Sequence, residues 1–119
     1  MGKRRGGQGF VIDTMTLTVS AGAVTPDCDK ATQFNIDNNA SFTINNASNP
    51  VDGYLVTFRI KNTHATNAIT ITLGAAFRFG SGVQLTDIQS IPALKKEYIT
   101  CRYDASDSKM DVVGYSPAH

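Results

Sequence analysis

Apolar and polar residues alternate along most of the chain, which is the pattern of strands rather than helices. Met15, Leu17 and Val19 alternate with three threonines, and this period of two predicts a strand with one buried and one solvated face. The alternation recurs in segments 34–36, 42–44, 54–62, 69–73, 99–104 and 110–115. Since no segment carries a convincing helical period, we expect an all-β fold with no helix longer than about three turns.

Turn-forming residues punctuate these segments. Asp37 to Ala40 lies between two alternating runs and predicts a hairpin turn, and Ala105 to Ser108 predicts another. Phe77 and Phe79 indicate a short strand or an extended loop. Pro92 follows a less regular apolar segment and excludes a central position in a ladder there.

The turns recur at a spacing typical of sandwiches and barrels. We predict an antiparallel β-sandwich, jelly-roll-like, because many short strands must each bury one face; a closed barrel is the alternative. The 119 residues suit one domain, which we place at residues 10–119 behind an arm of residues 1–9. The predicted core contains Leu17, Phe34, Ile36, Phe42, Ile44, Val56, Phe58, Ile60, Ile71 and Val112.

The arm is basic, whereas the charges of the whole chain nearly balance. The chain has a net charge of +1, yet Lys3, Arg4 and Arg5 all lie in its first five residues beside several glycines. A segment of this composition cannot order itself, so we predict a flexible basic arm that becomes ordered on a partner. No aromatic residue interleaves the basic ones, which favours an acidic protein surface over nucleic acid.

Targeting signals are absent from the sequence. No apolar stretch reaches the length of a membrane span, and no secretory apolar region follows the basic start. We therefore expect no export through a membrane and no membrane partner.

The residues that could perform catalysis are few and poorly placed. His64 lies in a polar loop and His119 is the last residue, whereas a catalytic histidine needs an orienting group. Cys28 and Cys101 are far apart and form no CxxC pair, so we expect no zinc site. A disulfide between them stays open, but two free thiols are the preferred interpretation because a domain of this size needs no staple. We predict no enzyme, no cofactor and no metal site.

Asp104, Asp107 and Asp111 form the one cluster with catalytic potential. Paired carboxylates of this kind serve glycoside hydrolysis or calcium binding. Yet they flank a predicted hairpin turn, where aspartate is favoured by its bonds to the local backbone. A solvated turn is the preferred interpretation, and a hydrolase stays the weaker alternative.

The region from about Ala31 to Tyr115 resembles β-rich modules of tailed-bacteriophage virions. Such modules occur as capsid decoration (cement) proteins and in head or tail fibres. They share an alternating pair of strands, a long strand led by glycine and a closing hairpin. The resemblance lies in Phe34-Asn35-Ile36, Ser41 to Asn45, Gly53 before Val56 to Ile60, Ile69-Thr70-Ile71 before Gly74, and Tyr103-Asp104 with Met110 to Tyr115.

The resemblance implies a jelly-roll-like sandwich that is made in the host cytoplasm and acts in the virion. We expect a decoration protein that binds the outer capsid surface and stabilises contacts between major capsid protein subunits, with Lys3, Arg4 and Arg5 as the capsid contacts. Exposed strand edges predict a homo-oligomer, a dimer or trimer. The alternative is a fibre or receptor-binding (adhesin) module, in which Tyr54, Tyr98 and Tyr115 supply contact surface.

Overall fold

The computed structural model describes residues 13–81 and 90–119, and every helix or strand element in these two ranges is a β-strand. The predicted arm, and with it Lys3, Arg4 and Arg5, lies outside the described residues. The described ranges hold no helix long and apolar enough to cross a membrane. The strands are β1 (Thr14–Leu17), β2 (Ala23–Val24), β3 (Gln33–Asn38), β4 (Phe42–Ile44), β5 (Leu55–Asn62), β6 (Ile69–Leu73), β7 (Phe77–Phe79), β8 (Ser90–Ile91), β9 (Lys96–Asp104) and β10 (Lys109–Ser116).

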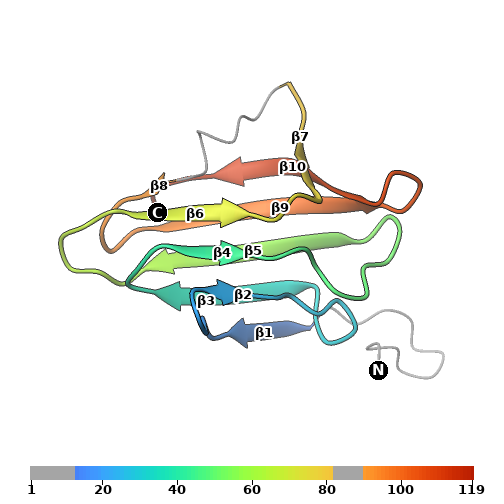
Figure 1. Ribbon diagram of the computed structural model, residues 1–119. Helices are drawn as coiled ribbons and strands as arrows, with labels where there is room; N and C mark the ends of the chain where they lie inside the picture. Colours follow the sequence, from blue (N-terminus) through green and yellow to red (C-terminus); the bar gives the residue numbers. More distant parts are fainter. Residues whose placement is uncertain (1–12, 82–89) are drawn as a thin grey trace.

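The strands form two sheets, which confirms an all-β fold of the sandwich type. The larger sheet has the order β1-β3-β5-β9-β10-β7, and the smaller has the order β2-β4-β6-β8. In Figure 1 the smaller sheet overlies the larger one. The buried apolar residues of both sheets form one cluster, so each sheet covers the apolar face of the other.

The predicted antiparallel pairing is wrong for the first half of the chain. From β1 to β6 the chain passes alternately between the two sheets, so that β1, β3 and β5 are parallel in one and β2, β4 and β6 are parallel in the other. This winding makes three successive coils. Parallel neighbours need a long crossover, and here each crossover contains a strand of the opposite sheet. Both sheets are mixed, because β5 pairs antiparallel with β9 and β6 pairs antiparallel with β8.

The predicted hairpin at Asp37 to Ala40 is also wrong. The segment connects β3 in the larger sheet to β4 in the smaller one, and the two strands do not pair. Within it, the Asn38 side chain donates to the carbonyl of Ala40 over 2.8 Å. A turn between sheets and a turn within a hairpin favour the same polar residues, so composition alone did not separate them.

The C-terminal half matches the sequence expectation better. Strands β9 and β10 form the predicted antiparallel hairpin, with a register shift between Val112 and Gly114, and β5 pairs antiparallel with β9. The segment 77–79 forms β7, which lies parallel to β10 at the edge of the sheet. Strand β8 lies at the edge of the smaller sheet just before Pro92, in accord with the constraint that proline imposes.

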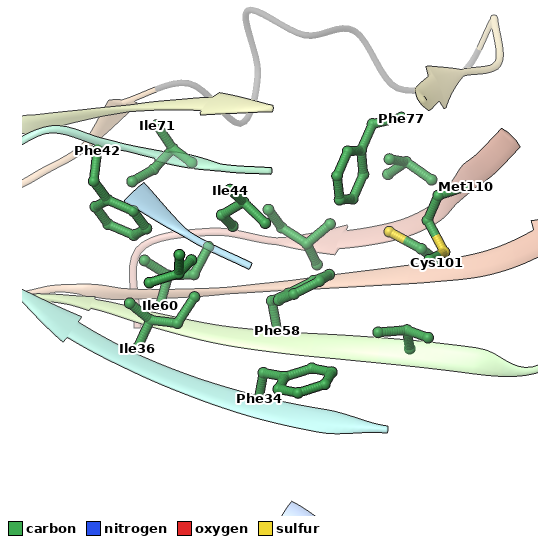
Figure 2. Packing of buried hydrophobic residues seen from close by; sticks show 14 of the residues in the cluster. Phe34, Ile36, Phe42, Ile44, Phe58, Ile60, Ile71, Phe77, Cys101 and Met110 are labelled. Carbon is green, nitrogen blue, oxygen red and sulfur yellow. The ribbon is translucent and has the colours of Figure 1, made fainter. Parts of the chain in front are cut away.

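The core lies between the sheets and is built from the predicted alternation. Phe34 and Phe58 are fully buried and stack with ring centroids 5.7 Å apart, and Phe58 also meets Phe77 at 6.1 Å. Figure 2 shows Ile44 of the smaller sheet on the side of Phe58, and Phe42 of the same sheet on the side of Ile60 and Ile36. Every predicted core residue except Leu17 is buried. Leu17 lies on edge strand β1 and is half-buried, because β1 has a neighbour on one side only.

Candidate functional site

The outer face of the larger sheet is broad and carries mostly polar side chains. It is formed by the residues that alternate with the buried ones, and the strand register aligns them in rows across the sheet. One row runs Thr16, Asn35, Arg59, Tyr98 and Ser116, and the next runs Thr14, Gln33, Thr57, Thr100 and Gly114. Hydroxyl and amide groups therefore line the middle of this face.

One end of this face concentrates positive charge. Lys61 on β5 is directly opposite Lys96 on β9 in the antiparallel ladder, and both are half-exposed. Asp37 is the register neighbour of Lys61 on β3, but its carboxylate pairs with Arg59 over 3.0 Å. Among the described residues neither lysine has an ion pair within 4 Å. Like charges directly opposite each other destabilise a sheet, so this arrangement costs stability.

An aromatic residue borders the two lysines. Tyr98 lies opposite Arg59, and its ring meets the ring of His119 in an edge-on arrangement with centroids 5.5 Å apart. The position of His119 is fixed by two backbone hydrogen bonds with Lys96 and by a 2.6 Å contact between its Nε2 and the Ser116 hydroxyl. We call Arg59, Lys61, Lys96, Tyr98 and His119 the basic patch.

The carboxylates suggested for hydrolysis lie at the opposite end and surround one arginine. Arg78 on β7 donates to both carboxylate oxygens of Asp111, at 2.6 and 3.1 Å, and to Asp107 at 2.9 Å. Asp104 lies 3.5 Å from the same guanidinium. This arrangement ties β7 to the β9–β10 hairpin. In residues 13–81 and 90–119, no group of three or more His, Cys, Asp and Glu side chains is placed to hold a metal ion.

His64 has a structural task in its loop. Its Nδ1 accepts hydrogen bonds from the backbone N–H groups of Thr66 and Asn67, at 3.1 and 3.0 Å. The fully buried Asn62 holds the same loop, because its side-chain oxygen accepts from His64 N–H and its amide donates to the carbonyls of Asn67 and Ile91. This hydrogen bonding accounts for His64 without a catalytic role.

Both cysteines are free thiols inside the protein. Cys28 and Cys101 are buried and do not bond to each other. Burial raises the pKa of the Cys28 thiol to about 11 and that of Cys101 to about 12. Only the thiolate is a good nucleophile, so neither group is activated near neutral pH.

Glu97 is a buried carboxyl that the sequence analysis did not single out. It lies on β9 opposite Ile60 and is only 1% exposed. Burial raises its pKa to about 8, and a hydrogen bond with Tyr115 opposes that shift. Its Oε2 has no hydrogen-bond partner among the described residues. The signal was present in the alternation, since Glu97 shares the parity of the buried Ile99 and Cys101.

Within residues 13–81 and 90–119, the first coil leaves two strand edges without a paired strand. Strand β1 ends the larger sheet and β2 ends the smaller one, and Figure 1 shows both at the same end of the molecule. The inward side chains of this coil, Met15, Leu17 and Val19, are only partly buried. Strand β1 has only four residues, but it carries no lysine, proline or bulge of the kind that often protects an edge.

Comparison with known proteins adds no relative to this description. No family model, curated protein or solved structure matches the chain.

Two surfaces of the described residues are the candidates for binding a partner: the β1 edge and the outer face with its basic patch. The sequence analysis named Tyr98 as a contact residue of the alternative function. It did not identify Lys61 and Lys96 as a pair, because their placement depends on the register of β5 and β9.

Proposed function

We propose that the protein is a virion structural protein, a capsid decoration protein that binds the outer surface of the phage head. Its partners in this proposal are the major capsid protein and further copies of itself. The resemblance of its strand patterns to those of phage virion modules supports a role in the virion, and the two stacked sheets with one common core are compatible with such a role. The jelly-roll-like order expected from that resemblance stays a prediction.

The outer edge of β1, which pairs with no other strand among the described residues, is the observation that carries the proposal. An exposed strand edge presents a row of backbone N–H and C=O groups that can pair with another chain. Two copies can pair through β1 around a two-fold axis, because the same strand then serves both partners. Such pairing would also cover the half-buried Met15 and Leu17. We therefore favour a dimer over the trimer that sequence analysis also allowed.

Attachment to the shell would act by mass action. A protein that binds only the assembled shell lowers the free energy of that state, and the effect grows as the concentration of the free protein rises above its Kd. In this proposal Lys3, Arg4 and Arg5 contact acidic residues of the coat. A fibre or receptor-binding module is the second candidate, and the polar outer face with Tyr98 favours it.

A charge placed on the β1 edge should separate the dimer. Thr16→Lys introduces a lysine on the outward side of β1 and leaves the apolar side chains unchanged. We expect sedimentation velocity to show a dimer for the unmodified protein and a monomer for this variant.

The matched control is Thr72→Lys, which places the same charge on the exposed side of β6, a strand paired on both sides. It should sediment as the unmodified protein does. If both variants and the unmodified protein sediment alike, pairing through β1 is wrong.

Removal of the arm should weaken capsid attachment without harming the fold. Deleting residues 2–9 removes three basic side chains but none of the buried cluster. The melting temperature should therefore stay nearly constant, while binding to expanded capsids that lack their decoration protein falls. Charge pairs at an interface rim are screened by salt, so replacing Lys3, Arg4 and Arg5 by serine should reproduce part of the loss and reduce the salt dependence.

Co-sedimentation of purified protein with those capsids measures both effects. Equal binding by the full-length and arm-deleted proteins at low salt would show that the arm takes no part in attachment. Failure of the full-length protein to bind at any salt concentration would refute the decoration role itself.

A further inference from the structure

The proposed function uses the arm for capsid attachment and the edge of β1 for pairing, and it gives the basic patch no role. It lies on the outer face of the larger sheet, on strands β5 and β9 at the centre of the strand order. Its two lysines lie opposite each other. The neighbouring Asp37 does not neutralise them, because its carboxylate pairs with Arg59. Three cationic side chains, the Asp37 carboxylate and the terminal carboxylate of His119 leave a net charge of +1 there. An anion bound between the two lysines would relieve their mutual repulsion.

We propose that the basic patch binds the carboxylate groups of an acidic glycan. Lys61 and Lys96 would hold one carboxylate between them, since the two residues are register partners on the same face of the sheet. The Tyr98 ring would support the sugar, because an aromatic ring offers flat apolar surface with a hydroxyl at its edge. This combination suits the mixed C–H and O–H surface of a pyranose.

The side chains around the patch favour a glycan over other polyanions. The rows beside Tyr98 present Asn35, Ser116, Gln33, Thr57 and Thr100, which donate and accept hydrogen bonds as sugar hydroxyls require. Duplex nucleic acid carries about one charge per 1.7 Å and is held by many cations. The two lysines have no ion-pair partner in the described part of the chain, and the arginine is shared with Asp37. This arrangement matches instead the sparse charge of an acidic polysaccharide.

A pair of ligands that differ only in charge tests the proposal. Oligogalacturonate carries one carboxylate per sugar, and its methyl ester has the same sugar without the charge. We expect calorimetric titration to show binding of the acid and at least tenfold weaker binding of the ester. An oligosialate provides a second acidic glycan, and poly-glutamate provides a polyanion without sugar.

The protein variants locate the site. The double change Lys61→Gln and Lys96→Gln should weaken oligogalacturonate binding at least tenfold, while Lys30→Gln with Lys109→Gln, which alters the net charge equally at distant positions, should change it less than twofold. Tyr98→Leu should weaken sugar binding more than poly-glutamate binding. Lys61→Gln alone should not lower the melting temperature, because it removes the like-charge pair.

Three results would overturn the proposal. One is failure of both oligogalacturonate and oligosialate to bind at millimolar concentration. Another is equal binding by the lysine double variant and its control. The third is tighter binding of poly-glutamate that does not depend on Tyr98, which would identify a surface for acidic proteins. All three measure a different ligand and different residues from the capsid experiment, so either proposal can fail without the other.

Discussion

Replacing Phe58 by alanine is expected to lower the free energy of unfolding by about 3–5 kcal/mol, the usual cost of removing a fully buried phenylalanine ring. Phe58 has no exposed surface, and it contacts the rings of both Phe34 and Phe77. It also lies on β5, which is paired on both sides. The surrounding chain therefore has little freedom to collapse into the cavity. Urea denaturation monitored by far-UV circular dichroism measures the change.

Leu55→Ala is the matched control for this experiment. Leu55 belongs to the same strand and is 57% exposed on the outer face. Its truncation should alter the free energy of unfolding by no more than about 0.5 kcal/mol, as is usual for surface changes. A loss below about 1 kcal/mol for Phe58→Ala would mean that the opposite face of β5 is the buried one.

The stability of the protein should fall as the pH rises from weakly acid to weakly alkaline, because of Glu97. Burial raises the pKa of this carboxyl from 4.5 to about 8. Below about pH 4.5 both the folded and the unfolded chain hold the proton, so the stabilisation is complete. Between the two values the unfolded chain releases its proton and the folded chain keeps it, so the free energy of unfolding decreases until about pH 8. Each pKa unit corresponds to about 1.4 kcal/mol, so the total loss is on the order of several kcal/mol.

Glu97→Gln should remove most of this pH dependence, because the amide has no proton to release in this range. We expect denaturation at a series of pH values to give a flatter profile for the variant and a higher stability than the unmodified protein above about pH 8. Asp27 and Asp104, whose pKa values are lowered by hydrogen bonds, titrate at more acid pH and do not obscure the slope. Asp29→Asn serves as the control and should keep the slope. Equal slopes for Glu97→Gln and the unmodified protein would contradict the assignment.

The fold class and the buried faces could be predicted from the alternation, because burial on one side of a strand leaves a direct mark in the sequence. Phe34, Ile36, Phe58 and Ile60 were assigned to the core on that basis and are fully buried. Pairing could not be predicted in the same way. Alternation is identical for parallel and antiparallel neighbours, so the direction of β3 relative to β5 was not encoded in it.

A weak signal of the parallel coils is nevertheless present. Met15 and Leu17 align in register with Phe34 and Ile36, and these align with Phe58 and Ile60. The pattern repeats at unequal intervals because the crossovers differ in length, and a search for a fixed repeat therefore misses it. The contacts of the basic patch and of Arg78 depend on the same long-range register. Residue types alone could not bring Lys61 to Lys96, or Arg78 to Asp111.

The coiled winding of the first half also makes this part of the protein modular. Successive strands in each sheet contact mainly the coil before and the coil after, as in solenoid proteins whose stability is a sum of neighbouring interfaces. A further coil built onto β1 and β2 would lengthen both sheets and bury Met15 and Leu17, yet it would leave the β9–β10 hairpin, Arg78 and the basic patch in place. Evolution or design can therefore change the length of this body by whole coils while keeping the hairpin and the basic patch.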